Sequence, residues 1–263
     1  MRLDPLRLGL VALLLALLFL PILAVGLNAF AVDWAGSVLP VGYTWRWMAE
    51  LWADPRFATA LQNSLILAVG SLIASAVICV PAILAAHCYF PKVDRWLAGL
   101  VVLPYAVPGI VMALGLLRIY AGNYGLVLTG SPWLLIWGYI PLGASLYYVP
   151  MKSSLNAMAV QDLLEAGYLL GISDLKLQWR VILPCVRQGV VIGLILNFTL
   201  VISEFVYANL LVGGMFPTMQ ILMYVMRGGS GHMLSVLIMV YFAVVLLATT
   251  LVSLIVMRRK EST

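Results

Sequence analysis

Residues 152–187 read KSSLNAMAVQDLLEAGYLLGISDLKLQWRVILPCVR, a polar island between two long apolar stretches. Apolar side chains recur at near-helical spacing over 162–170, which predicts a short helix. Gly171 is suited to the left-handed conformation that commonly ends a helix, and Ser173 is a good N-cap for a second one. Pro184 would stop or kink that second helix. The stretch therefore predicts two short helices with a glycine hinge between them.

The leucines of this loop have no obvious burial site within so short a segment. A face of this kind fits a protein partner that meets the loop outside the lipid. The alternative is an amphipathic segment that lies on the lipid headgroups. The helical pattern alone leaves both interpretations open.

The order and spacing of residues in the loop resemble the EAA loop of the membrane permease subunits of ATP-binding-cassette (ABC) importers. That motif reads Glu-Ala-Ala, three residues, Gly, nine residues, Ile-x-Leu-Pro. The matching residues here are Glu165-Ala166-Gly167, Gly171 and Val181-Ile182-Leu183-Pro184. Gly167 departs from the second Ala, and Val181 departs from Ile. The match over the twenty residues of 165–184 favours a permease loop over a lipid-surface helix.

Composition excludes an ordinary soluble domain. Of the 263 residues, 64% are hydrophobic and 10% are charged, and the mean hydropathy is +1.08. We therefore expect an all-α integral membrane protein with about six spans of roughly 20 residues each. The expected spans are 9–31, 58–87, 97–117, 134–150, 190–211 and 233–257, with the loop 152–187 outside the lipid. The net charge of +5 does not indicate nucleic-acid binding, because most basic residues flank apolar runs.

The distribution of Lys and Arg predicts the orientation. The first apolar run is too long for a typical signal-peptide core, so an uncleaved first span is favoured over cleavage near Ala29-Phe30-Ala31. Six spans place both termini on one side, together with the turn at 92–95 and the loop 152–187. Eleven of the 15 Lys and Arg residues fall on that side, which predicts that it is cytoplasmic. The resemblance to ABC importer permeases implies a location in the bacterial inner membrane.

No catalytic constellation is present in the sequence. The chain contains no Gly-Lys dipeptide and hence no phosphate-binding loop, so we expect it to be a transporter subunit and not an ATPase. Its three cysteines lack C-x-x-C spacing, which indicates reduced structural residues. The adjacent pair His87-Cys88 is too small a group to predict a metal site.

One acidic residue, Glu204, lies inside an apolar run. A carboxylate in the bilayer costs about 2.5 to 3.5 kcal/mol on insertion scales, so it should face the bundle interior or a water-filled path. Asn197 lies seven residues earlier on the same helical face, and Tyr207 and Asn209 follow nearby. We expect these side chains to line the translocation route and to favour a cationic solute. The alternatives are a structural hydrogen bond or ion pair between helices and a shallow position in the outer leaflet.

The resemblance covers the whole chain apart from its tails and implies the six-span type I ABC importer architecture. It implies four kinds of partner: two cytoplasmic ATPase subunits that bind ATP and Mg²⁺, a second permease that is identical or homologous, an extracytoplasmic solute-binding protein, and membrane lipid. No cofactor is implied for the chain itself. The residues implied in coupling are Glu165, Ala166, Gly167 and Gly171, with Leu183 and Pro184 bracing the loop and Leu163, Leu164 and Leu169 contacting the ATPase.

The resemblance defines the class of transporter more narrowly than the solute. The resemblance extends to polyamine, phosphonate, iron and sugar importers, and Glu204 favours a polyamine or another amine-bearing solute. A self-contained secondary transporter or channel, with Glu204 carrying a coupling ion, is the main alternative. A membrane-embedded scaffold protein without solute flux is another. The secondary-transporter alternative gives the spacing of the EAA-like loop no role.

Overall fold

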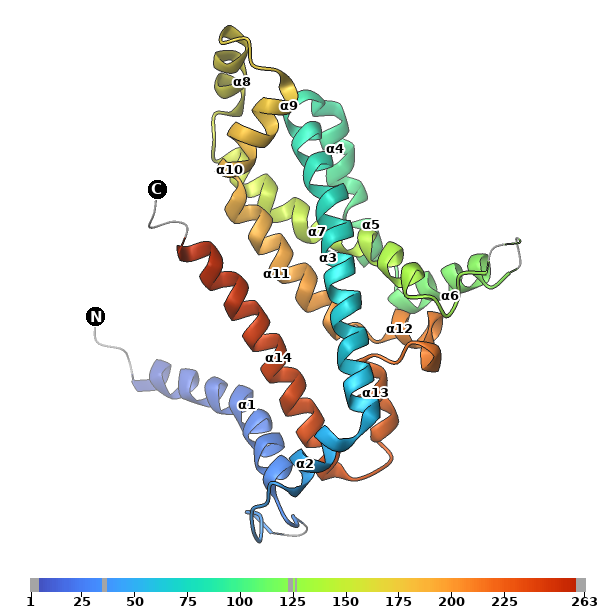
Figure 1. The fold of residues 1–263 in the computed structure, drawn as a ribbon. Helices are drawn as coiled ribbons and strands as arrows, with labels where there is room; N and C mark the ends of the chain where they lie inside the picture. The colour runs from blue at the N-terminus through green and yellow to red at the C-terminus, as the bar shows by residue number, and fades with distance from the viewer. Residues whose placement is uncertain (1–4, 35–36, 123–124, 126, 259–263) are drawn as a thin grey trace. The chain divides into compact units, whose positions relative to one another are not determined.

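The computed structural model describes residues 5–34, 37–122, 125 and 127–258, and these residues are mostly helical. Within the described ranges, extended pairing is limited to isolated bridges between Ala31 and Tyr43 and between Ala121 and Val127. Figure 1 labels the helices along the chain. The chain divides into a first unit, Met1–Thr59 with Leu222–Leu246, and a second unit, Ala60–Ile221 with Leu247–Thr263. The predicted all-α fold class is confirmed.

The first unit is held together by polar contacts at one end of its helices. It contains α1 (Pro5–Phe30), α2 (Arg46–Ala53) and the first part of α14 (Gly231–Arg258). The Asn28 side chain donates to Ser235 Oγ at 2.8 Å, and His232 Nδ1 lies 2.9 Å from the Asn28 carbonyl oxygen. The Trp47 ring stacks on the His232 ring at 5.2 Å. These contacts join α1, α2 and α14.

The second unit contains most of α3 (Pro55–Tyr89), α4 (Pro91–Leu100), α5 (Leu103–Ala106), α6 (Gly109–Tyr120), α7 (Pro132–Asn156), α11 (Arg187–Ser203) and α12 (Val206–Leu211). Helices α7 and α11 pack closely because glycines of α11 face α7. An added Cβ at Gly189 would lie 2.6 Å from the Pro150 carbonyl oxygen, and one at Gly193 would lie 2.7 Å from the Tyr147 ring. Neither position has room for a side chain.

Prolines break the helix that follows α4. Val107 is extended, with φ −98° and ψ 130°, because a residue before proline avoids the helical region. Pro108 then caps α6, and the axis turns by 93° between residues 91–106 and Gly109–Tyr120. The expected span 97–117 is therefore built from α4, α5 and α6 rather than from one straight helix.

Among the described residues, four helices are long and apolar enough to cross a membrane, and the number is up to six if each of two bent pairs forms one span. The four are Leu8–Phe30, Pro55–Tyr89, Pro132–Asn156 and Gly231–Leu251. The second bent pair, Asp174–Cys185 with Arg187–Ser203, turns by 74°. Helix α7 continues to Asn156, into the polar stretch 152–187, and α11 ends at Ser203, inside the expected span 190–211.

The connection between α11 and α14 is also partly helical. It contains the short turn Gly213–Met215 and α13 (Met219–Met226). Within the second unit, the Ser64 hydroxyl of α3 accepts a hydrogen bond of 2.8 Å from the Met219 amide. The start of α13 is thereby fixed against α3.

Candidate functional site

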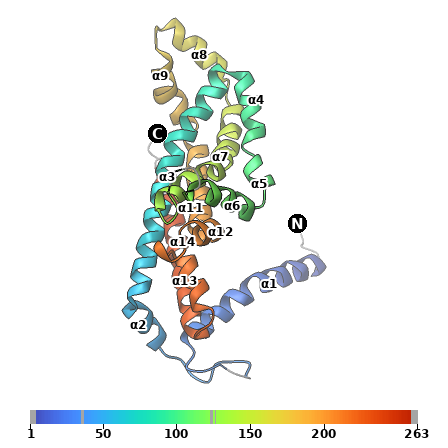
Figure 2. The same cartoon turned by 90° about the vertical axis from the view of Figure 1, so that its right-hand side faces the viewer.

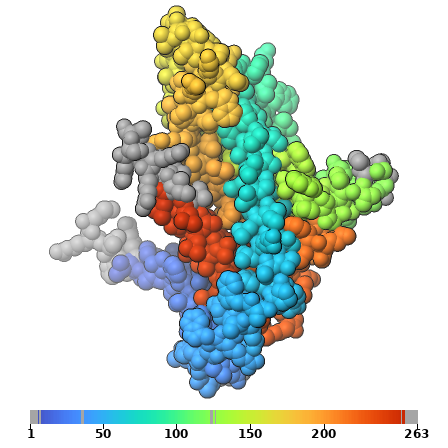
Figure 3. All heavy atoms as spheres, in the orientation of Figure 1, coloured from blue at the N-terminus to red at the C-terminus, as the bar shows by residue number. Residues whose placement is uncertain are grey.

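The polar loop folds into a compact structure that we call the elbow, residues 160–185. It consists of α8 (Val160–Leu169), α9 (Asp174–Leu177), a π-helical turn (Gln178–Ile182) and α10 (Leu183–Cys185). In Figures 1 and 2, α8 and α9 lie at the end of the second unit, next to the ends of α3 and α4. The space-filling view shows the elbow as the outermost part of this unit (yellow in Figure 3).

Gly171 forms the hinge as the sequence predicts. Its φ of +69° is left-handed, and its amide donates to the Tyr168 carbonyl oxygen at 2.9 Å. The Ile172 amide donates to the Gly167 carbonyl oxygen at 3.0 Å. This pair of bonds is the Schellman motif, which satisfies the last carbonyls of a helix. Ser173 then precedes α9 in an extended conformation, at the predicted N-cap position, but its side chain makes no capping bond.

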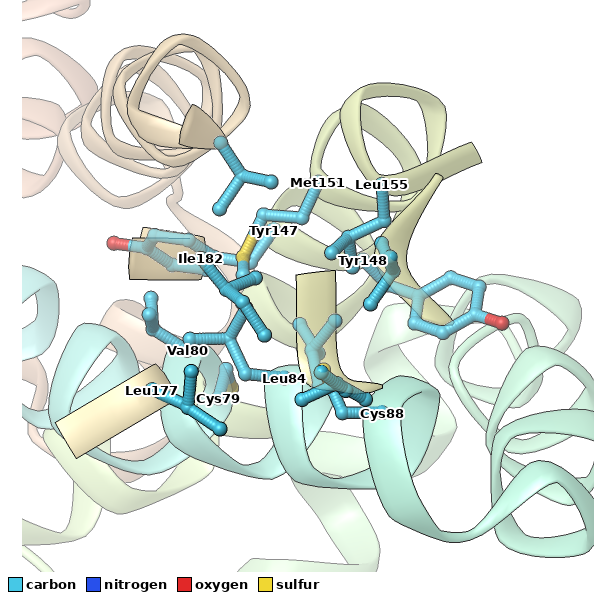
Figure 4. Packing of buried hydrophobic residues seen from close by; sticks show 14 of the residues in the cluster. Cys79, Val80, Leu84, Cys88, Tyr147, Tyr148, Met151, Leu155, Leu177 and Ile182 are labelled. Atoms are coloured by element: carbon cyan, nitrogen blue, oxygen red, sulfur yellow. The ribbon is translucent and has the colours of Figure 1, made fainter. Parts of the chain in front are cut away.

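One face of α8 packs on the rest of the second unit. Leu164 is only 3% exposed and belongs to an apolar cluster with Leu84 of α3 and Leu177 of α9. Gly167 is buried against Leu177, and a Cβ added at Gly167 would overlap the Leu177 side chain. Figure 4 shows side chains of α3, α7 and the elbow converging in this cluster. The elbow is thus anchored by its apolar face.

The opposite face of α8 is open. Leu169 is 89% exposed and Leu170 is 77% exposed, and Leu163, Glu165 and Ala166 are also exposed. Leu164, which was also expected to contact an ATPase, is buried in the chain's own apolar cluster and offers no exposed surface for that contact in this structure. Leu163 and Leu169 remain available for such a contact.

The far end of the elbow turns sharply into α11. The π-helical turn precedes Pro184, whose ring cannot fit a regular helical interior. Leu183 is half-buried and packs against the apolar cluster, whereas Pro184 is exposed. Leu183 therefore braces the elbow by packing, and Pro184 lies where the helix changes direction.

Glu204 lies at a break between helices and not within one. It is half-buried and extended, with φ −77° and ψ 126°. Its carboxylate accepts hydrogen bonds from the Tyr207 amide at 2.9 Å, the Ala208 amide at 3.2 Å and the Tyr139 hydroxyl at 2.8 Å. A carboxylate near the first amides of a helix is favourable, so Glu204 stabilises the start of α12.

The break separates Glu204 from Asn197, which was expected on the same helical face. Asn197 on α11 is fully buried, and its side-chain oxygen would be 2.7 Å from a Cβ added to Gly143 of α7. Tyr207 on α12 is buried with its ring 5.9 Å from that of Tyr139, and Asn209 is half-buried. Asn197 therefore lies in a packed helix interface, and only Glu204 and Asn209 keep partial exposure.

A groove of about 920 Å³ runs along α7 and α11 beneath the elbow. Its lining includes Tyr105, Ser145, Ser153, Cys185 and Gln188, all uncharged. The sequence interpretation missed this groove, because its residues come from four separate helices, α5, α7, α10 and α11.

The sequence interpretation also missed a charged cluster at the base of the elbow. Asp94 of α4, His87 of α3 and Lys152 of α7 are in mutual contact, with His87 Nδ1 lying 2.7 Å from Lys152 Nζ. His87 thus contacts an ion pair in this structure, while its neighbour Cys88 is buried in the apolar cluster.

Comparison with known proteins agrees with this geometry. Residues 78–261, more than half of the chain, match the family described as binding-protein-dependent transport system inner membrane component. The spermidine/putrescine transport system permease protein PotC of Escherichia coli (strain K12) is 26% identical over 229 residues, which cover 84% of this chain and 82% of PotC. The putrescine transport system permease protein PotI of the same strain is 24% identical, covering 85% and 78%.

Two further similarities extend this picture. The putative 2-aminoethylphosphonate transport system permease protein PhnV of Salmonella paratyphi A is 25% identical over 193 residues, which cover 73% of this chain and 71% of PhnV. A crystal structure of a bacterial ABC transporter involved in the import of the acidic polysaccharide alginate has the same fold, with a TM-score of 0.76, 14% identity and 94% coverage of both chains. This chain belongs to the family of binding-protein-dependent transport system inner membrane components and is an ABC importer permease subunit.

Proposed function

We propose that the chain forms half of a solute pathway and that its elbow docks into a separate cytoplasmic ATPase. The observation that carries this proposal is the exposure of Leu169 and Leu170 at the end of a helix whose other face is anchored in the second unit. Exposed apolar side chains on an anchored, protruding helix are suited to a protein partner. Glu165 and Ala166 are exposed on the surface that the ATPase would meet, and Gly167 and Gly171 set the geometry of the elbow behind it.

The proposed assembly contains two ATPase subunits, a second permease and an extracytoplasmic solute-binding protein. The ATPases supply the ATP and Mg²⁺ sites, and this chain binds no cofactor and catalyses no reaction itself. Both termini and the elbow lie in the cytoplasm. Eleven of the 15 Lys and Arg residues support this orientation, since basic residues concentrate on the cytoplasmic side.

Copurification of the ATPase with two matched variants of α8 tests the docking. Leu169→Asp places a charge on the exposed face, and we expect the tagged permease to lose its ATPase while its unfolding temperature stays unchanged. Leu164→Asp places the same charge in the apolar cluster, where it destabilises the protein itself. A Leu169→Asp variant that retained the ATPase at the wild-type ratio would contradict docking through this face.

The proposed solute is an amine-bearing small molecule. The names of PotC, PotI and PhnV all specify amine-bearing solutes, and Glu204 supplies a partly exposed carboxylate. Uptake of labelled putrescine in membrane vesicles containing the complete transporter, with spermidine, 2-aminoethylphosphonate and maltose as competitors, checks this class. We expect the amines to compete and maltose not to compete. Competition by maltose alone would exclude an amine-selective importer.

A further inference from the structure

The charged cluster at the base of the elbow joins three helices of the second unit. Asp94 on α4 is 8% exposed, and its Oδ2 contacts Lys152 Nζ of α7 and lies 3.3 Å from His87 Nδ1 of α3. The Tyr148 hydroxyl of α7 donates to Asp94 Oδ1 at 3.0 Å. In Figure 4 this hydroxyl points away from the apolar cluster. Asp94 is therefore bonded to both neighbouring helices.

A second set of polar contacts links the elbow to α3. Tyr89, two residues after His87, donates its hydroxyl to the Asp174 carbonyl oxygen at 3.2 Å. The neighbouring Asp174 carboxylate raises the pKa of Tyr168 on α8. The last turn of α3 thus contacts the elbow through Tyr89 and the other two helices through His87.

The chain itself provides a less direct route from the elbow to the spans. Towards α11 it passes through a π-helical turn and a bend of 74°. Towards α7 it passes through the three residues 157–159. Such irregular joints absorb movement. The lateral contacts with the last turns of α3 are direct: the exposed hydrogen bond of Tyr89 lies beside the buried apolar packing of Leu84 on Leu164 and Leu177.

Buried ion pairs add little stability compared with apolar packing, but they fix the orientation of the groups that they join. We propose that Asp94, Lys152 and His87 form a clamp that makes α3, α4 and α7 move as one body with the elbow. This proposal rests on the docking function of the elbow. Asp94 and Lys152 are then positioning residues for transport, since they convert movement of the elbow into movement of the spans.

The test measures solute uptake and ATP hydrolysis by the complete transporter in proteoliposomes. In Lys152→Met, Asp94 keeps its buried charge without its main partner, so we expect lower stability as well as poor coupling. The double variant Asp94→Asn/Lys152→Met has no unpaired charge, and we expect its unfolding temperature to return towards that of the wild type. Its uptake per ATP hydrolysed should nevertheless fall by about five-fold or more.

The matched control is Glu50→Gln, which removes the exposed ion pair between Arg46 and Glu50 in the first unit. We expect wild-type coupling from this variant. A stable double variant with wild-type uptake per ATP would overturn the clamp, because the cluster would then serve stability alone. A wild-type chain that never associates with an ATPase would overturn the proposed function as well, so the two failures are distinguishable.

Discussion

Gly167 shows how one residue sets the geometry of the elbow. It replaces the second Ala of the EAA motif, and its backbone lies directly against Leu177. We expect Gly167→Ala to destabilise the chain by about 1–3 kcal/mol, because the added methyl group must displace a packed side chain. The unfolding temperature of the purified permease in detergent measures this effect.

A double-mutant cycle separates this contact from the change in helix propensity. Leu177→Val shortens the side chain that meets Gly167, so the double variant Gly167→Ala/Leu177→Val should be less destabilised than the sum of the single changes. If the destabilisation by the double variant equalled the sum of the two single changes, the close approach of α8 and α9 would not limit the size of the side chain at residue 167.

Glu204 is the residue at which a structural and a transport role compete. Its bonds to the amides of Tyr207 and Ala208 support the structural role, and its partial exposure supports the predicted pathway with Asn209. Glu204→Gln keeps an acceptor oxygen for those amides but removes the charge. We expect a stable protein whose uptake of putrescine falls by about ten-fold, because a bond to a charged group is lost.

Glu204→Asp is the matched control, since it keeps the negative charge with a shorter side chain. We expect it to retain preference for amines over neutral solutes. Full transport with unchanged selectivity in Glu204→Gln would leave the carboxylate with a structural role only. Asn197 and Tyr207, both buried, would then lose their predicted place in the pathway as well.

At the scale of the element, the hinge of the elbow depends on the left-handed Gly171. Proline fixes φ near −65° and lacks the amide that donates to Tyr168, so Gly171→Pro removes both features of the cap. We expect normal membrane insertion, continued ATP hydrolysis and loss of uptake. Transport and hydrolysis assays on the reconstituted transporter measure the amount of solute taken up for each ATP hydrolysed.

Gly171→Asn is the control for this prediction. Asparagine visits the left-handed region more readily than other residues with a Cβ, so we expect near-normal uptake. The uptake by Gly171→Ala should lie between the uptake by Gly171→Asn and that by Gly171→Pro. Normal uptake by Gly171→Pro would show that the elbow does not act through this hinge.

The two helix breaks differ in how far the sequence predicts them. The hinge at Gly171 was predictable because glycine and the apolar spacing are local signals. The break at Glu204 was not, because LVISEFVY contains neither glycine nor proline and looks like a continuous helix. There the carboxylate bonds the next amides and Tyr139, which lies 65 residues away in sequence. Tertiary contacts thus override the local pattern.

At the scale of the whole molecule, composition alone predicted a helical membrane protein, since burial in lipid needs only long apolar runs. It could not predict the clamp. Asp94 and Lys152 are 58 residues apart, and no sequence pattern around either residue indicates that the two are in contact. Periodicity also could not show which leucine of α8 faces inward, because the elbow packs on α3, a helix whose place depends on the complete fold.

The orientation of the chain is a whole-molecule property that a labelling experiment can test. Of the three cysteines, Cys185 is exposed at the end of the elbow, whereas Cys79 and Cys88 are buried. A membrane-impermeant maleimide should therefore label mainly Cys185. We expect labelling in inside-out vesicles and not in intact spheroplasts, because the distribution of basic residues predicts a cytoplasmic elbow.

A cysteine introduced on the opposite side of the membrane should show the opposite labelling pattern in the same experiment. Val38 is 91% exposed and precedes α2 on the side predicted to be extracytoplasmic. Val38→Cys combined with Cys185→Ser should be labelled in spheroplasts. Labelling of Cys185 from outside would reverse the orientation, and an elbow on that side could not meet a cytoplasmic ATPase. The same measurement therefore tests the charge argument and the premise on which the docking of Leu169 depends.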